Sequence, residues 1–323
     1  MTSSTSVSND HSHHTLAPRY EHVAVLIPCY NEEVTVGKVV TDFKNALPGT
    51  SIYVYDNNST DNTAKIARKM GAIVVHASKQ GKGHVVRQMF DEVEAEVYFM
   101  VDGDDTYPVD AAPLLIEEFY KGGADMIVGA RISSYEEGSF RRFHKLGNRL
   151  VAKLISSLFS TQVTDILSGY RVFSRTFVKT VPLMSKGFEI ETEMTLQSLA
   201  KNLRVKEVPI KYRSRPPGSY SKLDTFSDGF LVLKSILIIF KDFKPLVFFS
   251  YLSAILFLIT ILAGIWPILD YLRLRYVYHV PLAILATGTG ILSALSLSIG
   301  VILETIAKYH NENFELFRRL LKK

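Results

Sequence analysis

The sequence has little cysteine and tryptophan, with Cys29 and Trp266 as single copies among 323 residues. A lone cysteine excludes an internal disulfide framework and fits a chain that folds in a reducing compartment. Charged side chains are absent from two long stretches, residues 245–269 and 280–303. Each stretch exceeds the roughly 20 apolar residues that a helix needs to cross a bilayer. The sequence therefore predicts two membrane spans and excludes a simple soluble protein.

The first 20 residues lack the basic start and the apolar run of a secretory signal peptide. They are polar, and we expect a disordered arm over residues 1–20. The cluster of His11, His13 and His14 leaves metal binding by this arm as the alternative.

Charge is distributed unevenly, although the formal net charge is only +5. Acidic side chains outnumber basic ones over residues 21–140, and basic ones outnumber acidic ones over residues 141–244. A basic segment just before membrane spans favours contact with anionic headgroups or phosphate. Nucleic acid would be the other partner of a basic chain, but the sequence contains no nucleic-acid-binding motif, so we expect none.

Between the arm and the spans, the pattern predicts alternating strands and helices. Apolar runs without alternation, typical of strands covered on both faces, lie at 23–28, 52–55, 73–75, 97–101 and 126–128. Helical patterns lie at 33–46, 61–70, 83–94 and 110–121. We expect helices to dominate residues 139–203 and a further strand at 204–213. This alternation predicts an α/β domain over residues 21–223 with a doubly wound, largely parallel sheet, whose ligands bind at the carboxyl ends of the strands.

The C-terminal part is predicted to be helical and membrane-associated. Apolar residues at helical spacing predict an amphipathic interface helix over residues 224–244, with a buried core helix as the alternative. Spans at 245–269 and 280–303 follow, and then an amphipathic tail at 304–323. Two spans place the large domain and the tail on one side of the membrane, and the flanking basic residues favour the cytoplasm.

The strongest chemical signal is the segment Asp102-Gly103-Asp104-Asp105 after the strand at 97–101. Clustered carboxylates repel one another unless a cation lies between them. Mg²⁺ or Mn²⁺ prefers such oxygen ligands and usually shares them with a bound phosphate. A solvated acidic turn is the alternative.

Further candidates follow the first three strands. Pro28, Tyr30 and Glu32 end the first, where a ring can stack on a base and a carboxylate can accept hydrogen bonds from a nucleoside; a helix-capping turn is the alternative. Asp56 ends the second strand, a usual place for a residue that binds ribose or base. Lys82 lies between two glycines before a helix, where the backbone can approach a phosphate.

Basic residues follow the fifth strand and precede the spans. Arg131 is followed by Arg141, and no acidic residue intervenes between Arg141 and Asp165. Arginine matches the geometry of phosphate in bidentate fashion. Lys222, in a Pro/Gly/Ser-rich loop next to the membrane segment, is a candidate phosphate clamp. A solvated basic face is the alternative for the whole set.

Taken together, these motifs resemble family 2 glycosyltransferases. The resemblance is strongest to the polyprenyl-phosphate glycosyltransferases, the group of the dolichyl-phosphate mannose synthases and bactoprenol glucosyltransferases. The matching segments, in family order, are 27–32, 56–63, 81–83, 102–104, 129–131, 165–171, 189–193 and 219–223. The two C-terminal spans match the bacterial members, so the resemblance implies an inner-membrane location, with the possibility of a homo-oligomer through the membrane helices or tail.

The resemblance implies a GT-A-type domain that moves a sugar from a nucleotide sugar to a polyprenyl phosphate with inversion. UDP-glucose is the favoured donor and GDP-mannose the alternative; a non-catalytic nucleotide-sugar binder and a transferase acting on hydroxyl groups are the other readings. The implied residues are Asp102 and Asp104 for Mg²⁺ or Mn²⁺; Pro28, Tyr30, Glu32, Asp56 and Lys82 for the donor nucleotide; Arg131, Arg141, Arg215 and Lys222 for the acceptor phosphate; and Asp165 as a polar catalytic-site residue.

The sequence departs from the family pattern at three points. Asn57 stands where a second aspartate usually follows the second strand, and Thr106 stands where a glutamine often assists the metal. The Gln-x-x-Arg-Trp motif of processive synthases is absent, because the single tryptophan lies inside a predicted span.

Overall fold

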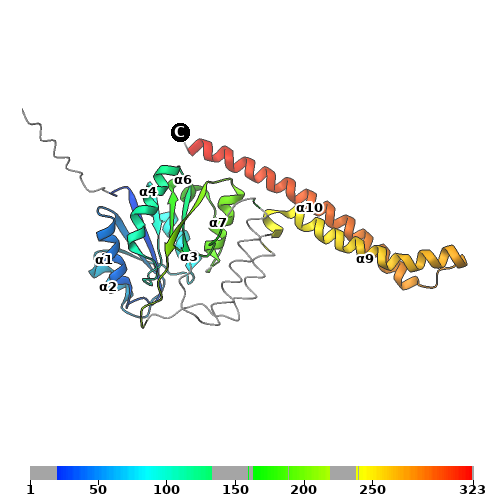
Figure 1. Ribbon diagram of the computed structural model, residues 1–323, viewed down its shortest axis with the longest axis horizontal. Coiled ribbons are helices and arrows are strands. Elements are labelled where there is room, and N and C mark those ends of the chain that lie inside the picture. Colours follow the sequence, from blue (N-terminus) through cyan, green and yellow to red (C-terminus); the bar gives the residue numbers. More distant parts are fainter. Residues whose placement is uncertain are drawn as a thin grey trace, which may run out of the picture.

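The computed structural model describes residues 20–132, 159, 163–187, 189–218, 238 and 240–321 (Figure 1). Residues 1–19 of the arm predicted over 1–20 and most of the predicted interface helix lie outside the described residues, as do the candidate residues Arg141 and Lys222.

A seven-stranded sheet forms the centre of the domain, in the order β3-β2-β1-β4-β6-β5-β7. Its strands are β1 (Val23–Cys29), β2 (Ser51–Asp56), β3 (Ile73–His76), β4 (Val97–Met100), β5 (Met126–Ile132), β6 (Arg171–Ser174) and β7 (Val205–Lys211). Strands β1 and β4 are rich in β-branched and aromatic residues and are buried on both faces, as the sequence predicts. The predicted α/β fold is therefore confirmed.

The sheet is mixed, because β6 pairs antiparallel with both β4 and β5. Among the described residues of 139–203, helices α6 (Arg175–Thr180) and α7 (Ile190–Ala200) dominate as expected, but the sequence does not reveal strand β6. Its four residues begin with an arginine and end with a serine, so they lack an uninterrupted apolar run. β6 is defined by its two neighbouring strands, which lie far away in the sequence.

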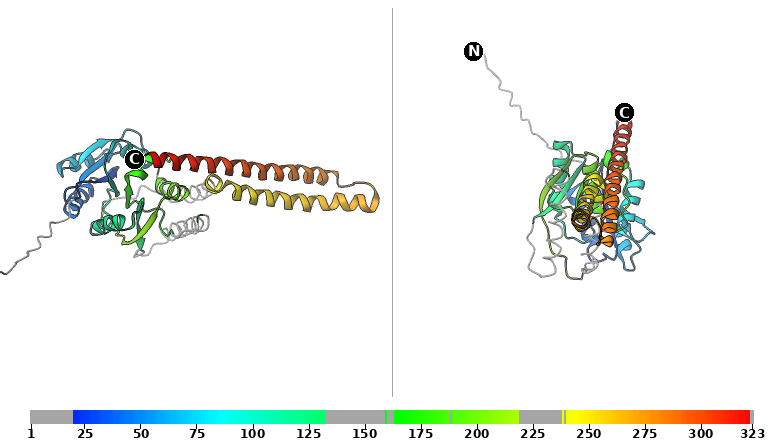
Figure 2. Two further views of the ribbon diagram at one scale, coloured as in Figure 1. Left: turned by 90° about the horizontal axis from the view of Figure 1, so that it is seen from above. Right: turned by 90° about the vertical axis from the view of Figure 1, so that its right-hand side faces the viewer.

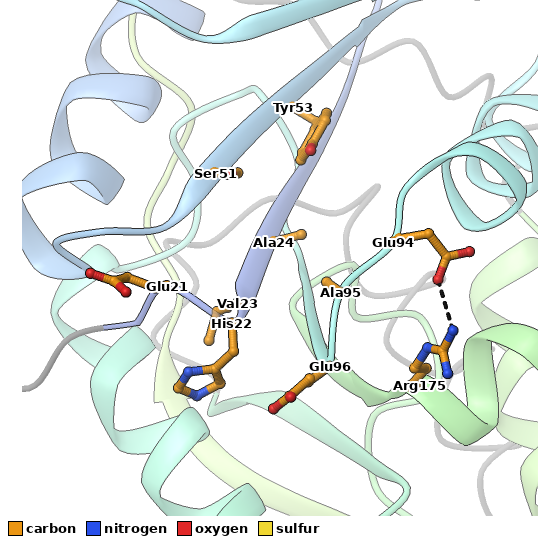
Figure 3. Close-up of a pocket in the computed structure, with 10 residues that line it drawn as sticks. All are labelled: Glu21, His22, Val23, Ala24, Ser51, Tyr53, Glu94, Ala95, Glu96 and Arg175. Carbon is orange, nitrogen blue, oxygen red and sulfur yellow. Dashed lines mark hydrogen bonds and ion pairs between the residues drawn. The ribbon is translucent and has the colours of Figure 1, made fainter.

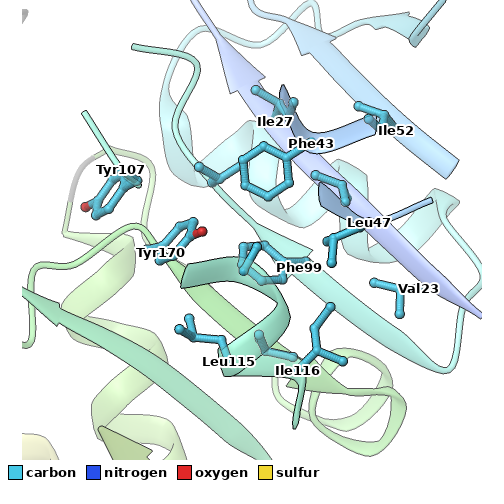
Figure 4. Packing of buried hydrophobic residues seen from close by; sticks show 14 of the residues in the cluster. Val23, Ile27, Phe43, Leu47, Ile52, Phe99, Tyr107, Leu115, Ile116 and Tyr170 are labelled. Atoms are coloured by element: carbon cyan, nitrogen blue, oxygen red, sulfur yellow. The ribbon is translucent and has the colours of Figure 1, made fainter. Parts of the chain in front are cut away.

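Helices cover both faces of the sheet. They are α1 (Val36–Ala46), α2 (Thr63–Lys69), α3 (Lys82–Glu92), the 3₁₀ turn η1 (Val109–Ala111), α4 (Ala112–Gly122), α6 (Arg175–Thr180) and α7 (Ile190–Ala200). One apolar cluster joins α1, α2 and α4 to the sheet, and Figure 4 shows Phe43, Phe99 and Tyr170 within it. The rings of Phe99 and Tyr170 lie edge to face, 5.0 Å apart. A second cluster packs α3, α6 and α7 on the other face.

Two long helices extend away from the domain as a hairpin (Figures 1 and 2). They are α9 (Pro245–Leu274) and α10 (Val280–Leu321), and both are long and apolar enough to cross a membrane. Only 6% of the most apolar window of α9 and 17% of that of α10 is buried in the structure, unlike the core helices of a soluble protein. Hydroxyl groups join the two helices, with Ser253 to Ser293 at 3.0 Å and Thr260 to Thr289 at 2.8 Å. The predicted tail continues α10 without a break.

Candidate active site

The sheet brings the acidic loops together at one edge. β1, β2 and β4 are parallel, with Cys29 paired to Asp56 and Leu26 paired to Met100. Their carboxyl ends therefore meet at the same edge, and the segments that follow β1 and β4 carry the remaining predicted acidic residues. The sequence prediction of a shared acidic edge holds for every one of these loops.

Asp56 lies at the end of β2 with a buried carboxylate. Its Oδ1 atom is buried and has no hydrogen-bond partner among the described residues. A buried acceptor without a partner is costly, and it usually points to a ligand or to a water molecule. Tyr30, on the neighbouring loop, is 38% exposed.

Asn57 has a structural role that an aspartate could not fill. Its amide nitrogen donates to the carbonyl oxygens of Ala77 at 2.9 Å and Lys79 at 2.8 Å. Its Oδ1 accepts a hydrogen bond from the Gly81 backbone N–H at 2.8 Å. This side chain therefore ties β2 to the loop that precedes α3, which explains the departure from the family's second aspartate.

Lys82 lies between two carboxylates. Its Nζ is 2.5 Å from Asp102 Oδ1 and 2.5 Å from Glu191 Oε1. Burial by itself would lower the pKa of Lys82, but the negative charges of Asp102 and Glu191 outweigh burial and raise the pKa well above its usual value. Lys82 therefore stays protonated and joins α3, the β4 loop and α7.

The glycines beside Lys82 approach protein backbone in this structure. Gly83 donates its N–H to the carbonyl oxygen of Lys186 at 3.0 Å, and a Cβ at Gly81 or Gly83 would collide with backbone of residues 185 and 186. The expected reason for these glycines was close approach to a phosphate; the observed reason is close packing of two loops.

Asp104 is held by a cation and a hydroxyl. Its Oδ2 lies 2.7 Å from Arg215 Nη2, and its Oδ1 accepts a hydrogen bond from Thr106 Oγ1 at 2.6 Å. Arg215 also lies 3.8 Å from Glu32 Oε1. Burial, and after it the negative charge of Asp102, raises the pKa of Asp104 against the opposing effect of Arg215. Thr106 thus orients the Asp104 carboxylate from the position where the family often has glutamine.

Arg131 and Asp165 form a bidentate pair. Arg131 Nε lies 2.7 Å from Asp165 Oδ2, and Nη2 lies 2.8 Å from Oδ1. The guanidinium also lies 5.4 Å from the ring centroid of Tyr212. Burial alone would raise the pKa of Asp165, but the hydrogen bonds and charge of Arg131 hold that pKa below its usual value.

These pairs change the arrangement that the sequence suggests. The sequence suggests an acidic donor side and a basic acceptor side, whereas the two described acceptor candidates, Arg131 and Arg215, each contact a carboxylate. Lys82, predicted on the donor side, contacts Asp102. Glu191 is a site residue that the sequence alone does not identify. The available signal was its place in the family-like segment 189–193, and its contact with Lys82 depends on the fold.

The two aspartates after β4 suit a divalent cation that arrives with its substrate. Among the described residues, no group of three or more His, Cys, Asp or Glu side chains is arranged to hold a metal. Mg²⁺ commonly uses one or two carboxylates and completes its shell with substrate phosphates and water. The carboxylates of Asp102 and Asp104 contact Lys82 and Arg215. These ion pairs show that positive charge is favourable beside both carboxylates. Asp102 and Asp104 therefore fit such an ion.

Comparison with known proteins agrees with this geometry. The family model described as glycosyl transferase family 2 matches residues 24–181. Glycosyltransferase AglJ of Haloferax volcanii is 29% identical over 304 residues, covering 94% of this chain and 99% of the relative. The dolichyl-phosphate hexose transferase of the same organism is 31% identical over 217 residues, covering 67% of this chain and 93% of the relative.

A solved structure shares the fold. Glucosyl-3-phosphoglycerate synthase from Mycobacterium tuberculosis, solved in complex with Mn²⁺, UDP-glucose and phosphoglyceric acid, superposes with a TM-score of 0.56 at 20% identity, covering 68% of this chain and 78% of that chain. The chain belongs to glycosyl transferase family 2, and it is a glycosyltransferase with a GT-A-type domain.

Proposed function

We propose that this protein transfers a hexose from a nucleotide sugar to a membrane polyprenyl phosphate, with inversion at the anomeric carbon. The observation that carries the proposal is the pair of cation-matched carboxylates, the half-buried Asp102 and the buried Asp104, in a domain attached to an apolar helical hairpin. The relative named dolichyl-phosphate hexose transferase, which this chain matches over most of its length, supports the same acceptor class.

In the proposed reaction, an oxygen of the acceptor phosphate attacks the anomeric carbon of the donor sugar. The bond from that carbon to the diphosphate breaks, and the nucleoside diphosphate leaves with the electron pair. The acceptor phosphate is already anionic at neutral pH, so the step needs no strong general base. One displacement inverts the configuration at the anomeric carbon.

The donor side of the site is assigned to the acidic edge of the sheet. Asp56 at the end of β2 offers to an N–H of the base its Oδ1, which has no partner among the described residues. Pro28, Tyr30 and Glu32 lie at the end of the neighbouring strand β1 and on the loop that follows it. Asp102 and Asp104 would hold Mg²⁺ or Mn²⁺, which neutralises charge on the leaving diphosphate when bound. Lys82 and Arg215, already against these carboxylates, add fixed positive charge beside the leaving group.

The acceptor side is assigned to the basic residues Arg131, Arg141, Arg215 and Lys222. Arg131 is held in place by its pair with Asp165, which uses Nε and Nη2, and its positive charge suits a phosphate. Arg215 contacts Asp104 and Glu32 of the donor side, so it would bring positive charge to the boundary of the two substrates. Arg141 and Lys222 complete the proposal from sequence alone.

UDP-glucose is the proposed donor, with GDP-mannose as the alternative. The solved M. tuberculosis relative in complex with UDP-glucose and Mn²⁺ supports a UDP-sugar in a GT-A site of this kind. To test this, purified protein is incubated with undecaprenyl phosphate and with radiolabelled UDP-glucose or GDP-mannose, with and without EDTA. We expect label in the organic phase from UDP-glucose, and its loss with EDTA. Transfer of label to an added hydroxyl acceptor, offered in place of undecaprenyl phosphate, would indicate a hydroxyl-specific transferase. Binding without transfer would indicate a non-catalytic protein.

We also propose that the domain and the tail lie in the cytoplasm of a bacterial-type inner membrane. The evidence is the pair of apolar helices, which returns the chain to its starting side, and the basic residues that flank that side. Single cysteines introduced at Leu274 and Leu320 test the orientation in spheroplasts, since the native Cys29 is buried. A cysteine at position 274 should react with an impermeant reagent and one at 320 should not; the reverse pattern would refute this topology.

A further inference from the structure

Helix α10 passes the start of α9 and continues beside the catalytic domain. Glu304 Oε2 accepts a hydrogen bond from the Leu246 backbone N–H at 3.3 Å, which places Glu304 level with the first turn of α9. From there α10 continues to Leu321. Figures 1 and 2 show its C-terminal end returning to the domain, and α10 contacts α6 there.

The returning segment contacts the domain through one buried aromatic side chain. Within residues 304–319, all of which the structure describes, Phe314 is the only buried residue, at 9% exposure. Phe314 belongs to the apolar cluster formed by α3, α6 and α7 on one face of the sheet. At a rise of about 1.5 Å per residue, it lies about 15 Å along the helix beyond Glu304. By contrast, Phe317 on the same helix is 52% exposed.

The partner of Phe314 on the domain is a buried lysine. Lys201 ends α7, is 6% exposed, and places Nζ 4.8 Å from the centroid of the Phe314 ring. No carboxylate pairs with Lys201 among the residues that the structure describes, and burial lowers the pKa of this lysine. An aromatic face attracts a desolvated ammonium group, so the contact between Lys201 and Phe314 combines a cation–π interaction with apolar packing.

This contact lies at the opposite end of the domain from the acidic edge. α6 follows β6, which is antiparallel to β4, and Lys201 precedes β7, which is parallel to β5. Both are therefore at the amino ends of the parallel strands. Just before α9, Phe243 packs against Ile166 and Leu196 of the domain. Helix α10 contacts the domain again at Phe314. The domain is thus attached to the hairpin at two separated points.

We propose that Phe314, seated on Lys201, is an anchor that fixes the angle of the catalytic domain to the membrane hairpin and so positions the active site toward a membrane-borne acceptor. Phe314 is a positioning residue, far from the reacting atoms. The proposal rests on the proposed function for its acceptor, and it predicts that the anchor matters for a lipid in a bilayer and has little effect on the donor.

The docking itself is tested by distance measurements on the full-length protein in liposomes. Spin labels are placed on α4 at Lys121 and on α10 at Tyr309, both exposed. Phe314→Ala should broaden the distance distribution, whereas Phe317→Ala, the matched control on the exposed side, should leave it unchanged. An unchanged distribution in Phe314→Ala would overturn the anchor.

The functional role is tested with undecaprenyl phosphate in vesicles. Phe314→Ala should raise the KM for the lipid by about tenfold, because orientation of the site relative to the acceptor is lost. Nucleotide affinity measured by calorimetry, and the activity of Phe317→Ala, should stay within about twofold of wild type, as for other substitutions away from the site. Phe314→Tyr, which keeps the ring, should restore the low KM.

Two outcomes separate this inference from the proposed function. A broadened distance distribution with an unchanged lipid KM would overturn the positioning role while wild-type transfer to the lipid still stands. Wild-type protein that transfers no sugar to polyprenyl phosphate would overturn the proposed function and the positioning role together, while the distance measurement would still report whether Phe314 holds the helix.

Discussion

Both ends of the β-sheet carry clustered acidic side chains, but the two clusters are held differently. At the amino ends of the strands, a hollow of about 530 Å³ is lined by Glu21, Glu94 and Glu96 (Figure 3). There Glu94 pairs with Arg175 at 3.1 Å, and both side chains are more than 60% exposed. At the carboxyl ends, Asp102 and Asp104 pair with lysine and arginine side chains that are mostly buried.

The difference shows that a hollow lined by acidic side chains does not by itself identify the active site of this domain. Surface ion pairs such as Glu94–Arg175 are solvated on both sides and contribute little to stability. The ion pairs at the carboxyl end hold charge in a poorly solvated position, where it is costly. Beside them, the buried Oδ1 of Asp56 has no partner among the described residues. Costly arrangements of this kind are concentrated where a ligand later compensates for them.

The largest expected effect comes from removing one carboxylate of the buried cluster. Asp104→Asn keeps the shape of the side chain but removes the charge that matches Arg215 and a divalent cation. We expect turnover to fall by about 100-fold or more, in the range found when one preorganised electrostatic group is removed. The measurement is transfer of labelled sugar to the lipid in the presence of Mg²⁺ or Mn²⁺.

The neighbouring Asp105 is the matched control for this substitution. It pairs with Lys38 on α1 at 2.8 Å, away from Arg215. Asp105→Asn should keep most of the turnover. Equal losses in both variants would show that general acidity of the loop matters, and would remove the specific role of Asp104.

The second effect is on folding. Lys82→Met leaves the buried Glu191 and the half-buried Asp102 close together without their shared cation, and breaking a buried pair costs about 3–5 kcal/mol. We expect a loss of that order in the free energy of unfolding of the catalytic domain, measured by urea denaturation of the full-length protein in detergent. Lys38→Met removes a half-exposed lysine and should cost about 1 kcal/mol or less.

A combined variant sharpens this result. If Lys82 stabilises the domain by neutralising Glu191, then adding Glu191→Gln to Lys82→Met should recover part of the lost free energy of unfolding. If no free energy of unfolding is recovered, the loss in Lys82→Met comes from Asp102 alone.

A smaller and opposite pair of effects is expected at Asp56. Asp56→Ala removes an acceptor that no described residue satisfies, so it should weaken donor binding by about tenfold, the loss expected for one hydrogen bond to a ligand. The free energy of unfolding should stay the same or rise. Calorimetry with the nucleoside diphosphate gives the first value and urea denaturation the second. A variant that loses stability but keeps donor affinity would assign Asp56 to the fold.

The acidic edge at the carboxyl ends of the strands could be predicted from local sequence. The apolar runs identify β1, β2 and β4, and parallel strands bring the residues that follow them to one edge, so the sequence alone is enough to place Asp56, Asp102 and Asp104 together. Such inference succeeds because each run is buried on both faces and has no competing pattern.

The pairings could not be predicted, because each one depends on contacts between distant segments. Glu191 reaches Lys82 only when α7 packs beside the loop before α3, and Arg215 reaches Asp104 after the chain has left β7. β6 is too short to have a pattern of its own. The burial of Phe314 also depends on tertiary structure, since its apolar spacing on α10 does not distinguish it from the exposed Phe317.

The smallest effect is expected at the amino end of the sheet. Hydrogen bonds from Lys179 first, and from Arg175, hold the pKa of Glu94 below its usual value. The ionised form is therefore favoured in the folded state, and any contribution to stability is present at neutral pH and is lost as the pH falls through the folded pKa. Because the group is exposed, Glu94→Gln should leave lipid glycosylation and donor affinity within about twofold of wild type.

The control for Glu94→Gln is the unchanged protein assayed at the same salt concentration, because surface pairs weaken as salt rises. If Glu94→Gln lowers turnover by as much as Asp56→Ala lowers donor affinity, the hollow at the amino end takes part in function. The distinction between the two ends would then fail, since exposure and surface pairing would no longer separate a structural acidic cluster from an active one.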